Sequence, residues 1–410
     1  MTDKKVYSNI WYLILVQFAN YIAPLMVLPY LTRVLNVDGF GVVVMAISMC
    51  SIAMIITDFG FNLSGTYWIS KHRNEEKLVC RYLGSVLSIK FVLSLVASII
   101  ALTYSSYANI NFDHTIQYAV VVIIISQSAQ LTWFFQGVEK MKNVTSSIVV
   151  SKILYMLSIF LFVNGPDDVD TVLICLALSN VVSSVIGFFL LLSGGFYLSI
   201  PEWREVKLAF KDSFPFFISR AAVGFYTSAS TFIVGSAVGI HQAAIYSSAE
   251  KLYQAGQGVT APVSQALYPY LARSGDVRSL YKFIIILLFP MVIGCSIFYF
   301  YAGDVLSLFY GPDFRAADSI LKYFLVCSII NFISVNFGYP AFATINRLDI
   351  VNRSVYLGGC IQIILLFLLF MNGNVNGVNV VRSVLFSEFV VMTFRITLFL
   401  LYRKKLSLRC

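Results

Sequence analysis

The sequence predicts an all-α integral membrane protein with twelve transmembrane helices, and its composition is the first reason. Hydrophobic residue types make up 59% of the 410 residues, while charged types make up only 12% and the mean hydropathy is +0.81. A soluble domain has about 45–50% apolar and about 25% charged residues. The charges are therefore too few to cover a water-facing surface, which excludes ordinary soluble domains and disordered scaffolds.

Long apolar runs separated by short polar breaks define the individual helices, because a helix needs about 20 apolar residues to cross a bilayer. Runs such as 283–300 and 361–370 are continuously apolar, whereas the strands of a membrane barrel alternate apolar and polar residues. The breaks carry turn residues such as Asn-Gly-Pro at 164–166. In chain order, the expected spans are 9–34, 40–69, 79–106, 115–138, 145–163, 171–193, 212–239, 244–271, 280–301, 319–343, 350–371 and 377–402.

The positions of Lys and Arg give the orientation of these spans. With a cytoplasmic N-terminus, 20 of the 29 basic residues fall in inner segments, and only Arg33 and Arg315 fall in outer segments. Cytoplasmic loops of membrane proteins carry this excess of positive charge. We therefore expect both termini to be cytoplasmic, and we interpret most of the net charge of +9 as an orientation signal.

An even span count and a long inner break predict two halves of six helices each. The N-terminal lobe is expected at 1–198, a cytoplasmic linker at 199–211 and the C-terminal lobe at 212–410. The longest outer segment, 302–318, is interpreted as a capped turn between helices.

Catalytic and metal-binding motifs are not evident in the sequence. It contains no GxxxxGK[ST] phosphate loop, no HExxH and no GxSxG. The seven cysteines are scattered without a CxxC pair, and the three histidines fall in separate loops. We therefore expect a protein that is not an enzyme and that has no metal site, no cofactor and no nucleic-acid partner.

Apart from residues at the span ends that are counted with the loops, ten ionisable side chains fall within the expected spans, where each costs roughly 2.5–3.5 kcal/mol at mid-helix. Arg395 and Lys322 lie near span ends and are expected to extend to the aqueous surface. Asp58 and Lys90 lie at the same depth on neighbouring antiparallel spans, so a structural salt bridge is one interpretation. The ten are Asp58, Lys90, Lys152, Arg220, Glu250, Lys251, Lys322, Arg382, Glu388 and Arg395.

Basic groups at several depths are typical of a wet, positively charged cavity, and they favour a cargo with an anionic part such as a phosphate or diphosphate. The candidate anion contacts are Lys90, Lys152, Arg220, Lys251 and Arg382. The acids Asp58, Glu250 and Glu388 are candidates either for binding a coupling ion or for holding the basic groups in place. Polar side chains on shared helix faces either line this cavity or bond between helices; they include Gln17, Asn20, Asn62 and Gln257.

Several ordered motifs resemble the polysaccharide flippases of the O-antigen (Wzx) type, which belong to the multidrug/oligosaccharidyl-lipid/polysaccharide exporter superfamily. The resemblance covers essentially the whole chain. Arg33, Asp58 and Glu250 belong to the matched motifs, without an assigned role. The motifs are the face of Gln17, Asn20 and Pro24, PYLTRVLNVDGFG at 29–41, DFGFN at 58–62, WFFQGVEKM at 133–141 and YSSAEKLYQ at 246–254.

The resemblance implies two pseudo-symmetric six-helix bundles arranged as a V in the bacterial inner membrane. It implies a flippase that moves an undecaprenyl-diphosphate-linked repeat unit from the inner to the outer leaflet by alternating access. Coupling to a gradient of Na⁺ or H⁺ is expected. Possible partners are membrane lipid, a polysaccharide polymerase and a chain-length regulator.

Two alternatives remain open at the level of sequence. A cation-coupled multidrug or metabolite antiporter of the same superfamily would be expected to carry an acidic cluster in its N-terminal half, where Asp58 is the only acid within a span. An integral-membrane polysaccharide polymerase would be expected to have a long outer loop with several arginines, which the sequence lacks.

Overall fold

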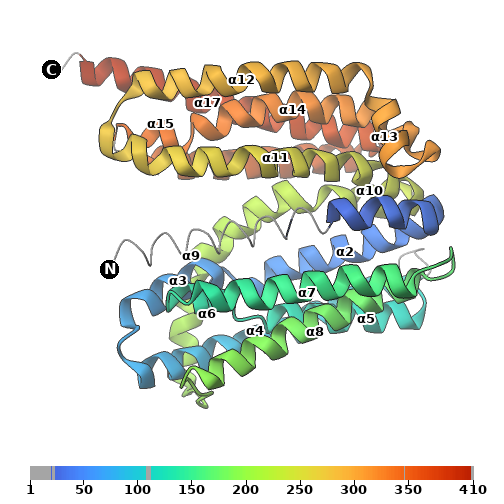
Figure 1. The fold of residues 1–410 in the computed structure, drawn as a ribbon. Helices are drawn as coiled ribbons and strands as arrows, with labels where there is room; N and C mark the ends of the chain where they lie inside the picture. Colours follow the sequence, from blue (N-terminus) through green and yellow to red (C-terminus); the bar gives the residue numbers. More distant parts are fainter. Residues whose placement is uncertain (1–19, 21–23, 108–111, 346, 408–410) are drawn as a thin grey trace. The chain divides into compact units, whose positions relative to one another are not determined.

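The computed structural model describes residues 20, 24–107, 112–345 and 347–407, and the regular secondary structure of these residues is helical (Figure 1). Residues 24–34 form the first helical stretch. The helices that follow are α2 (Asn36–Asp58), α3 (Phe61–His72), α4 (Glu76–Tyr107), α5 (His114–Ser128), α6 (Thr132–Gly137), α7 (Met141–Phe162), α8 (Val169–Ser193), α9 (Trp203–Ser228), α10 (Ser230–Val238), α11 (Ile240–Ser274), α12 (Val277–Phe300), α13 (Ala302–Tyr310), the 3₁₀ helix η1 (Pro312–Ala317), α14 (Asp318–Asn336), α15 (Tyr339–Ala343), α16 (Leu348–Met371) and α17 (Gly377–Ser407).

Nine segments of the described residues are long and apolar enough to cross a membrane, and each coincides with one of the predicted spans. The prediction of an all-helical multi-pass membrane protein is therefore confirmed. The predicted span 9–34 lies largely outside the described residues. The spans 212–239 and 244–271 are helical as α9, α10 and α11 but are not among the nine. The total of twelve spans in two bundles stays a prediction.

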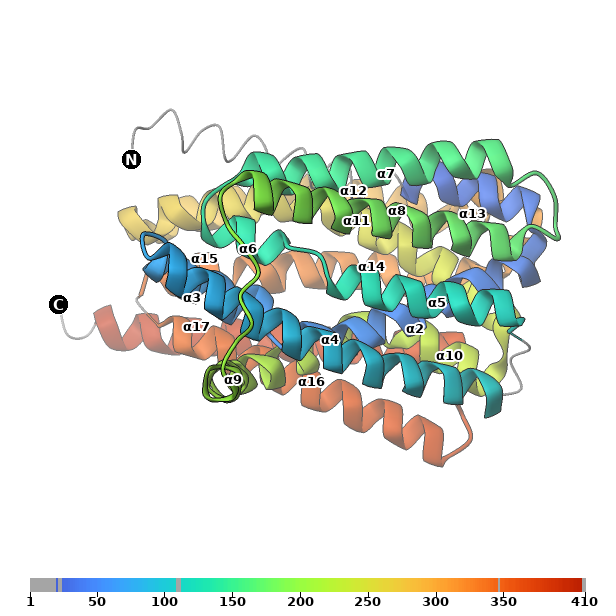
Figure 2. The ribbon, with the colours of Figure 1, turned by 90° about the horizontal axis from the view of Figure 1, so that it is seen from below.

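The chain divides into two compact units, Met1–Gly224 and Phe225–Cys410. In the first unit, α2 packs against α4, α5 and α8, and α8 also packs against α7 (Figure 2). In the second unit, α14 packs against α11, α12 and α17 (Figure 1). The lobes expected from the sequence, 1–198 and 212–410, stay a prediction.

A helix break at Phe59 and Gly60 interrupts the predicted span 40–69. Both residues have a left-handed backbone, with φ of 46° and 80°. A Cβ on Gly60 would lie 2.7 Å from the backbone nitrogen of Phe217, so only glycine fits. Phe59 is buried, and its ring stacks on those of Phe210 and Phe217 at centroid distances of 4.4 and 4.7 Å. These contacts hold the first part of α9 on the first unit.

The segment 302–318 was expected to be a capped turn, and this prediction is wrong. It forms α13 and the 3₁₀ helix η1. Ala302, Leu306 and Tyr310 recur every four residues and are at most 1% exposed, so this face of α13 is packed into the second unit.

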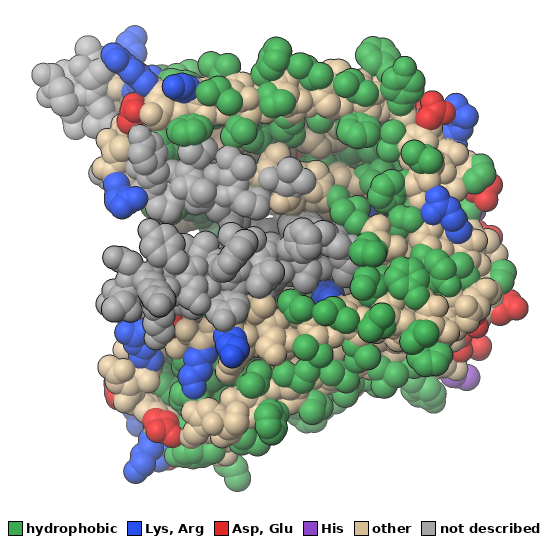
Figure 3. Space-filling model, in the orientation of Figure 1, with side chains coloured by type: hydrophobic (Ala, Val, Ile, Leu, Met, Phe, Trp, Pro, Cys, Tyr) green, Lys and Arg blue, Asp and Glu red, His purple; other side chains and the backbone are tan. Residues whose placement is uncertain are grey.

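Hydrophobic side chains cover the flanks of the helices in Figure 3, where lipid would contact them. Helix α12 is the extreme case, because only 6% of its most apolar stretch is buried. Within the second unit, the Lys and Arg side chains visible in Figure 3 lie mostly toward the end at which α17 finishes.

The segment between α8 and α9 is attached to the first unit. The Phe196 ring packs edge-on against an aromatic ring of α6, at 5.0 Å between centroids. The backbone N–H of Tyr197 donates to the Sγ of Cys80 at 3.4 Å. A Cβ on Gly84 would overlap the carbonyl oxygen of Ser199. The backbone of this segment therefore lies directly on α4.

We predict that Gly84→Ala lowers the melting temperature of the purified protein in detergent. The added methyl group meets the Ser199 carbonyl, and such overpacking costs about 1–3 kcal/mol. The matched control is Gly294→Ala in α12, where nothing lies within 4 Å of the added Cβ. This control should melt at or above the wild-type temperature, because alanine is favoured over glycine inside a helix. Equal melting temperatures for the two variants would contradict the close packing at Gly84.

Candidate functional site

A polar cavity of about 530 Å³ lies within the first unit, among α2, α3 and α5–α9. Its volume is typical of sites for small ligands, which range over about 300–1,000 Å³. The lining residues that the structure describes include amide, hydroxyl and basic side chains but no carboxylate. The polar ones are Asn20, Asn62, Gln127, Gln130, Thr132, Gln136, Ser151, Lys152, Tyr155, Ser179, Asn180, Ser183 and Arg220.

Three glutamines reach this cavity from the interrupted stretch formed by α5 and α6. Gln127 lies at the end of α5, Gln130 lies between the two helices, and Gln136 lies in α6. The Nε2 of Gln130 donates to the Oδ1 of Asn180 at 3.1 Å, and the Nδ2 of Asn180 donates to the carbonyl of Leu176 at 2.8 Å. These bonds connect the break to α8 and orient the Gln130 amide.

Two basic side chains line the cavity from different helices. Lys152 is half-buried on α7, and Arg220 is exposed on α9. Both were predicted as anion contacts, and the structure places them on one cavity together with the predicted polar residues Asn20 and Asn62. The sequence reasoning missed Gln127, Gln130, Gln136 and Asn180, although three glutamines in one apolar run were a usable signal.

Asp58 and Lys90 are both buried in the first unit, with exposures of 6% and 3%. Lys90 and Arg220 are the basic groups that act electrostatically on the Asp58 carboxylate, and the backbone N–H groups of Gly60 and Asn62 point toward it. Among the residues that the structure describes, none forms a hydrogen bond with the buried Oδ1 of this carboxylate. Asp58 and Lys90 therefore interact electrostatically, but no salt bridge between them is found among the described residues, and neither residue lines the cavity.

Five predicted site residues lie in the second unit, and each has a hydrogen-bond partner there. The shortest of these bonds joins the Thr231 Oγ1 to the Glu250 Oε2 at 2.6 Å. The partners are Thr231 for Glu250, Gln254 for Lys251, Tyr253 for Gln257, Tyr323 for Arg382 and Asn331 for Glu388. Both acids, Glu250 and Glu388, are buried. The roles of all five stay predictions.

Two further predicted site residues, Gln17 and Arg33, lie near the N-terminus, and neither is among the described residues that line the cavity. Gln17 lies outside the described residues. Arg33 is exposed and donates to the carbonyl of Pro29, one helical turn earlier.

Arg395 was expected to extend to the aqueous surface, and this prediction is wrong. Its side chain is 9% exposed. The guanidinium donates to the Oγ of Ser354 at 2.8 Å and to the carbonyl and Oγ of Ser334 at 2.9 and 3.1 Å. The hydrogen bonds from α14 and α16 compensate the burial of the charge. Lys322 is half-buried at the start of α14, where it pairs with Asp318 at 2.7 Å.

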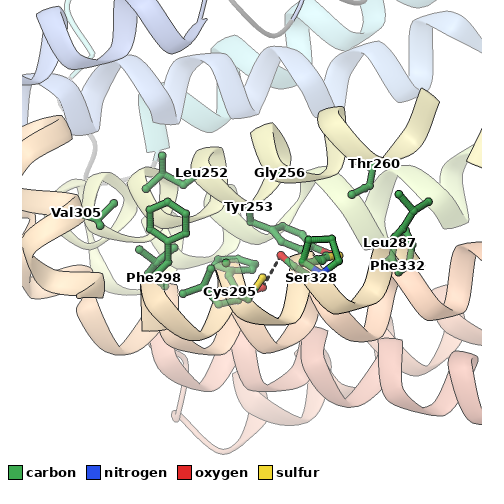
Figure 4. Close-up of a pocket in the computed structure, with 16 residues that line it drawn as sticks. Leu252, Tyr253, Gly256, Thr260, Leu287, Cys295, Phe298, Val305, Ser328 and Phe332 are labelled. Carbon is green, nitrogen blue, oxygen red and sulfur yellow. Dashed lines mark hydrogen bonds between the residues drawn. The ribbon is translucent and has the colours of Figure 1, made fainter. Parts of the chain in front are cut away.

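A second cavity, of about 540 Å³, lies in the second unit between α11, α12 and α14 (Figure 4). Leu252, Leu287, Phe298 and Phe332 point into it, with few polar atoms such as those of Ser328 (Figure 4). The described residues of this lining include no charged side chain. This cavity can accommodate apolar groups, but its described lining has no basic side chain that could compensate the charge of a phosphate.

Comparison with known proteins assigns this chain to a family. The model of a family described as polysaccharide biosynthesis protein matches residues 6–275, which is more than half of the chain. The chain belongs to the polysaccharide biosynthesis protein family. A protein of Shigella dysenteriae named as a proposed O-antigen transporter is 25% identical over 394 residues, covering 94% of this chain and 98% of the relative. A protein of Escherichia coli strain K12 with the same name is 28% identical over 267 residues, or 64% of each chain.

Solved structures of transporters share the fold. A structure of the lipid II flippase MurJ in an inward closed conformation matches with a TM-score of 0.69 and 13% identity, covering 95% of this chain and 87% of the other. A multidrug resistance MATE family transporter of the MOP superfamily in an inward-facing conformation matches with a TM-score of 0.64 and 15% identity, covering 94% and 98%. The predicted resemblance to O-antigen transporters is confirmed by the family model and the two named relatives, and the solved structures show the shared fold. The relatives are named as transporters, which agrees with the expectation of a protein that is not an enzyme.

We predict that Asp58 and Lys90 depend on each other for stability. Asp58→Asn leaves Lys90 buried without its acid, and Lys90→Met leaves the acid without that base, so each should cost about 3–5 kcal/mol. The double variant should be more stable than either single variant, as measured by denaturation of the purified protein. Asp113→Asn, at an exposed helix start, is the control and should be neutral. Strictly additive losses would show that the two charges are independent.

Proposed function

We propose that the protein is a flippase for an undecaprenyl-diphosphate-linked repeat unit of O-antigen or a related polysaccharide. It moves this lipid-linked oligosaccharide from the inner to the outer leaflet of the bacterial inner membrane by alternating access. The proposal rests on the family, on relatives named as O-antigen transporters and on a fold shared with a lipid II flippase.

The observation that carries the proposal is the charge of the cavity in the first unit. Lys152 and Arg220 line it, and its described lining includes no carboxylate. Lysine and arginine are the usual ligands of phosphate and diphosphate groups in proteins. A cationic drug would instead need an acid in the lining, which disfavours the multidrug antiporter as the alternative function.

The same proposal includes twelve spans in two six-helix lobes with both termini in the cytoplasm. The excess of Lys and Arg in the expected inner segments supports this orientation. A polysaccharide polymerase and a chain-length regulator are the proposed protein partners, because the flipped unit must then be polymerised.

Ion coupling is proposed for the buried acids, with H⁺ or Na⁺ as the coupling ion. Glu250 is the candidate chosen for the test; the residue is 8% exposed, and its carboxylate accepts a short hydrogen bond of 2.6 Å from Thr231. Asp58 and Glu388 are the others. A buried acid within a membrane-spanning helix costs free energy, and such residues commonly bind or relay ions.

We predict that Arg220→Ala abolishes most flipping. Loss of a charge-assisted hydrogen bond to a diphosphate costs about 1.5–3 kcal/mol, or about 10- to 150-fold in binding. In a strain in which this variant replaces the wild-type protein, lipid-linked repeat units should accumulate in the inner leaflet while surface polysaccharide falls. Arg204→Ala, an exposed arginine outside the cavity, is the control and should leave both unchanged. Normal surface polysaccharide with Arg220→Ala would contradict the assignment.

We predict that Glu250→Gln separates transport from the ion gradient. The amide keeps the size of the carboxylate but cannot release a proton or bind a cation with a negative charge. In proteoliposomes, an imposed H⁺ or Na⁺ gradient should stimulate the wild-type protein and no longer stimulate the variant. Glu202→Gln, on the exposed segment before α9, is the matched control. Full stimulation of Glu250→Gln by the same gradient would exclude Glu250 as the coupling residue.

A further inference from the structure

The amide side chains of the first-unit cavity are not accounted for by a diphosphate alone. Six amides line the cavity, compared with two basic side chains. An amide offers both donors and an acceptor, whereas a phosphate group presents mainly acceptors. Amides therefore match the hydroxyl and acetamido groups of sugars, which also donate and accept. The six are Asn20, Asn62, Gln127, Gln130, Gln136 and Asn180.

Two of the glutamines are available to a ligand. Within the described part of the chain, the side-chain amides of Gln127 and Gln136 form no hydrogen bond, although both are half-buried. Polar groups among membrane-spanning helices are costly unless they have a partner or face water. Their position on the cavity wall lets them meet this requirement through water or a polar ligand.

Gln130 is oriented in advance by its neighbours. Its Nε2 is occupied by Asn180, and Asn180 is in turn held by the carbonyl of Leu176, so the Oε1 of Gln130 is left to accept a hydrogen bond. The Oε1 of Gln130 is therefore an acceptor in a fixed position, near the amides of Gln127 and Gln136. Such an arrangement selects ligands whose hydrogen-bonding groups have a matching spacing as well as a matching polarity.

The basic side chains restrict where charge can be placed in the ligand. Lys152 and Arg220 are the cationic lining residues, and they lie on α7 and α9, whereas the three glutamines come from the α5–α6 stretch. Anionic and uncharged parts of a ligand therefore meet different walls of one cavity.

We infer that Gln127 and Gln136 are specificity-determining residues that bind the hydroxyl and acetamido groups of an uncharged sugar, while Lys152 and Arg220 bind the anionic group attached to it. This inference rests on the proposed function and names the part of the substrate that the first unit recognises. The Gln130–Asn180 pair is the positioning element of this sugar subsite.

The test compares two probes on purified full-length protein in detergent. One is the lipid-linked repeat unit extracted from a strain that lacks this protein, and the other is undecaprenyl diphosphate without sugar. Gln127→Leu and Gln136→Leu should each weaken binding of the repeat unit about three- to tenfold, the usual worth of a neutral hydrogen bond. Neither should change binding of the sugar-free lipid. Gln117→Leu, elsewhere on α5, is the matched control and should bind both probes normally.

The sugar-free probe also serves as the folding control. Arg220→Ala should weaken binding of both probes, which separates the anion contact from the sugar contact. The inference is overturned if the two leucine variants bind the repeat unit as tightly as the wild type, or if they lose both probes equally. The proposed function itself fails if the wild-type protein binds neither probe, which is a different result.

Discussion

Hydrocarbon provides no hydrogen bonds, so each polar side chain placed among the spans must find a partner or face water, and this constraint organises both units. In the second unit it is met by direct pairing: Arg395 donates to oxygen atoms of Ser334 and Ser354, and Glu250 accepts from Thr231. In the first unit many polar groups instead face a shared cavity. The candidate functional site therefore lies where polar side chains face a cavity, and not where they form hydrogen bonds with one another.

Breaks between helices bring these polar side chains of the first unit together. Asp58 ends α2, where a carboxylate is disfavoured by the helix dipole, but the reversal at Phe59 and Gly60 brings it to the first N–H groups of α3, where a negative charge is favoured. The break between α5 and α6 likewise turns a stretch of apolar helix into a wall that presents Gln127 and Gln136. In an unbroken α-helix, Gln127 and Gln136 are nine residues apart and would point to opposite faces, so the break is what allows both to line one cavity.

Hydropathy predicted most of the fold because the length of an apolar run depends only on the chain: the expected span 79–106 corresponds to α4 at Glu76–Tyr107. It could not predict the breaks, which depend on tertiary contacts such as the one between Gly60 and α9. Charge counting found Lys152 and Arg220 but missed the uncharged amides. A polar residue within a span did not by itself indicate the cavity: Ser213, in the predicted span 212–239, bonds to Ser64 and is fully buried.

The electrostatic interaction between Asp58 and Arg220 affects how tightly the cavity can hold an anionic cargo. Arg220 lines the cavity and also acts electrostatically on Asp58, so its charge is partly compensated from within the protein. An anionic group that enters the cavity therefore competes with a carboxylate for Arg220 and does not meet an isolated cation. Such competition lowers the net free energy of binding, because part of the gain from the ligand is offset by the loss of the interaction with Asp58. A transporter benefits from this arrangement, since a site that binds a diphosphate too tightly would hold its cargo instead of passing it on.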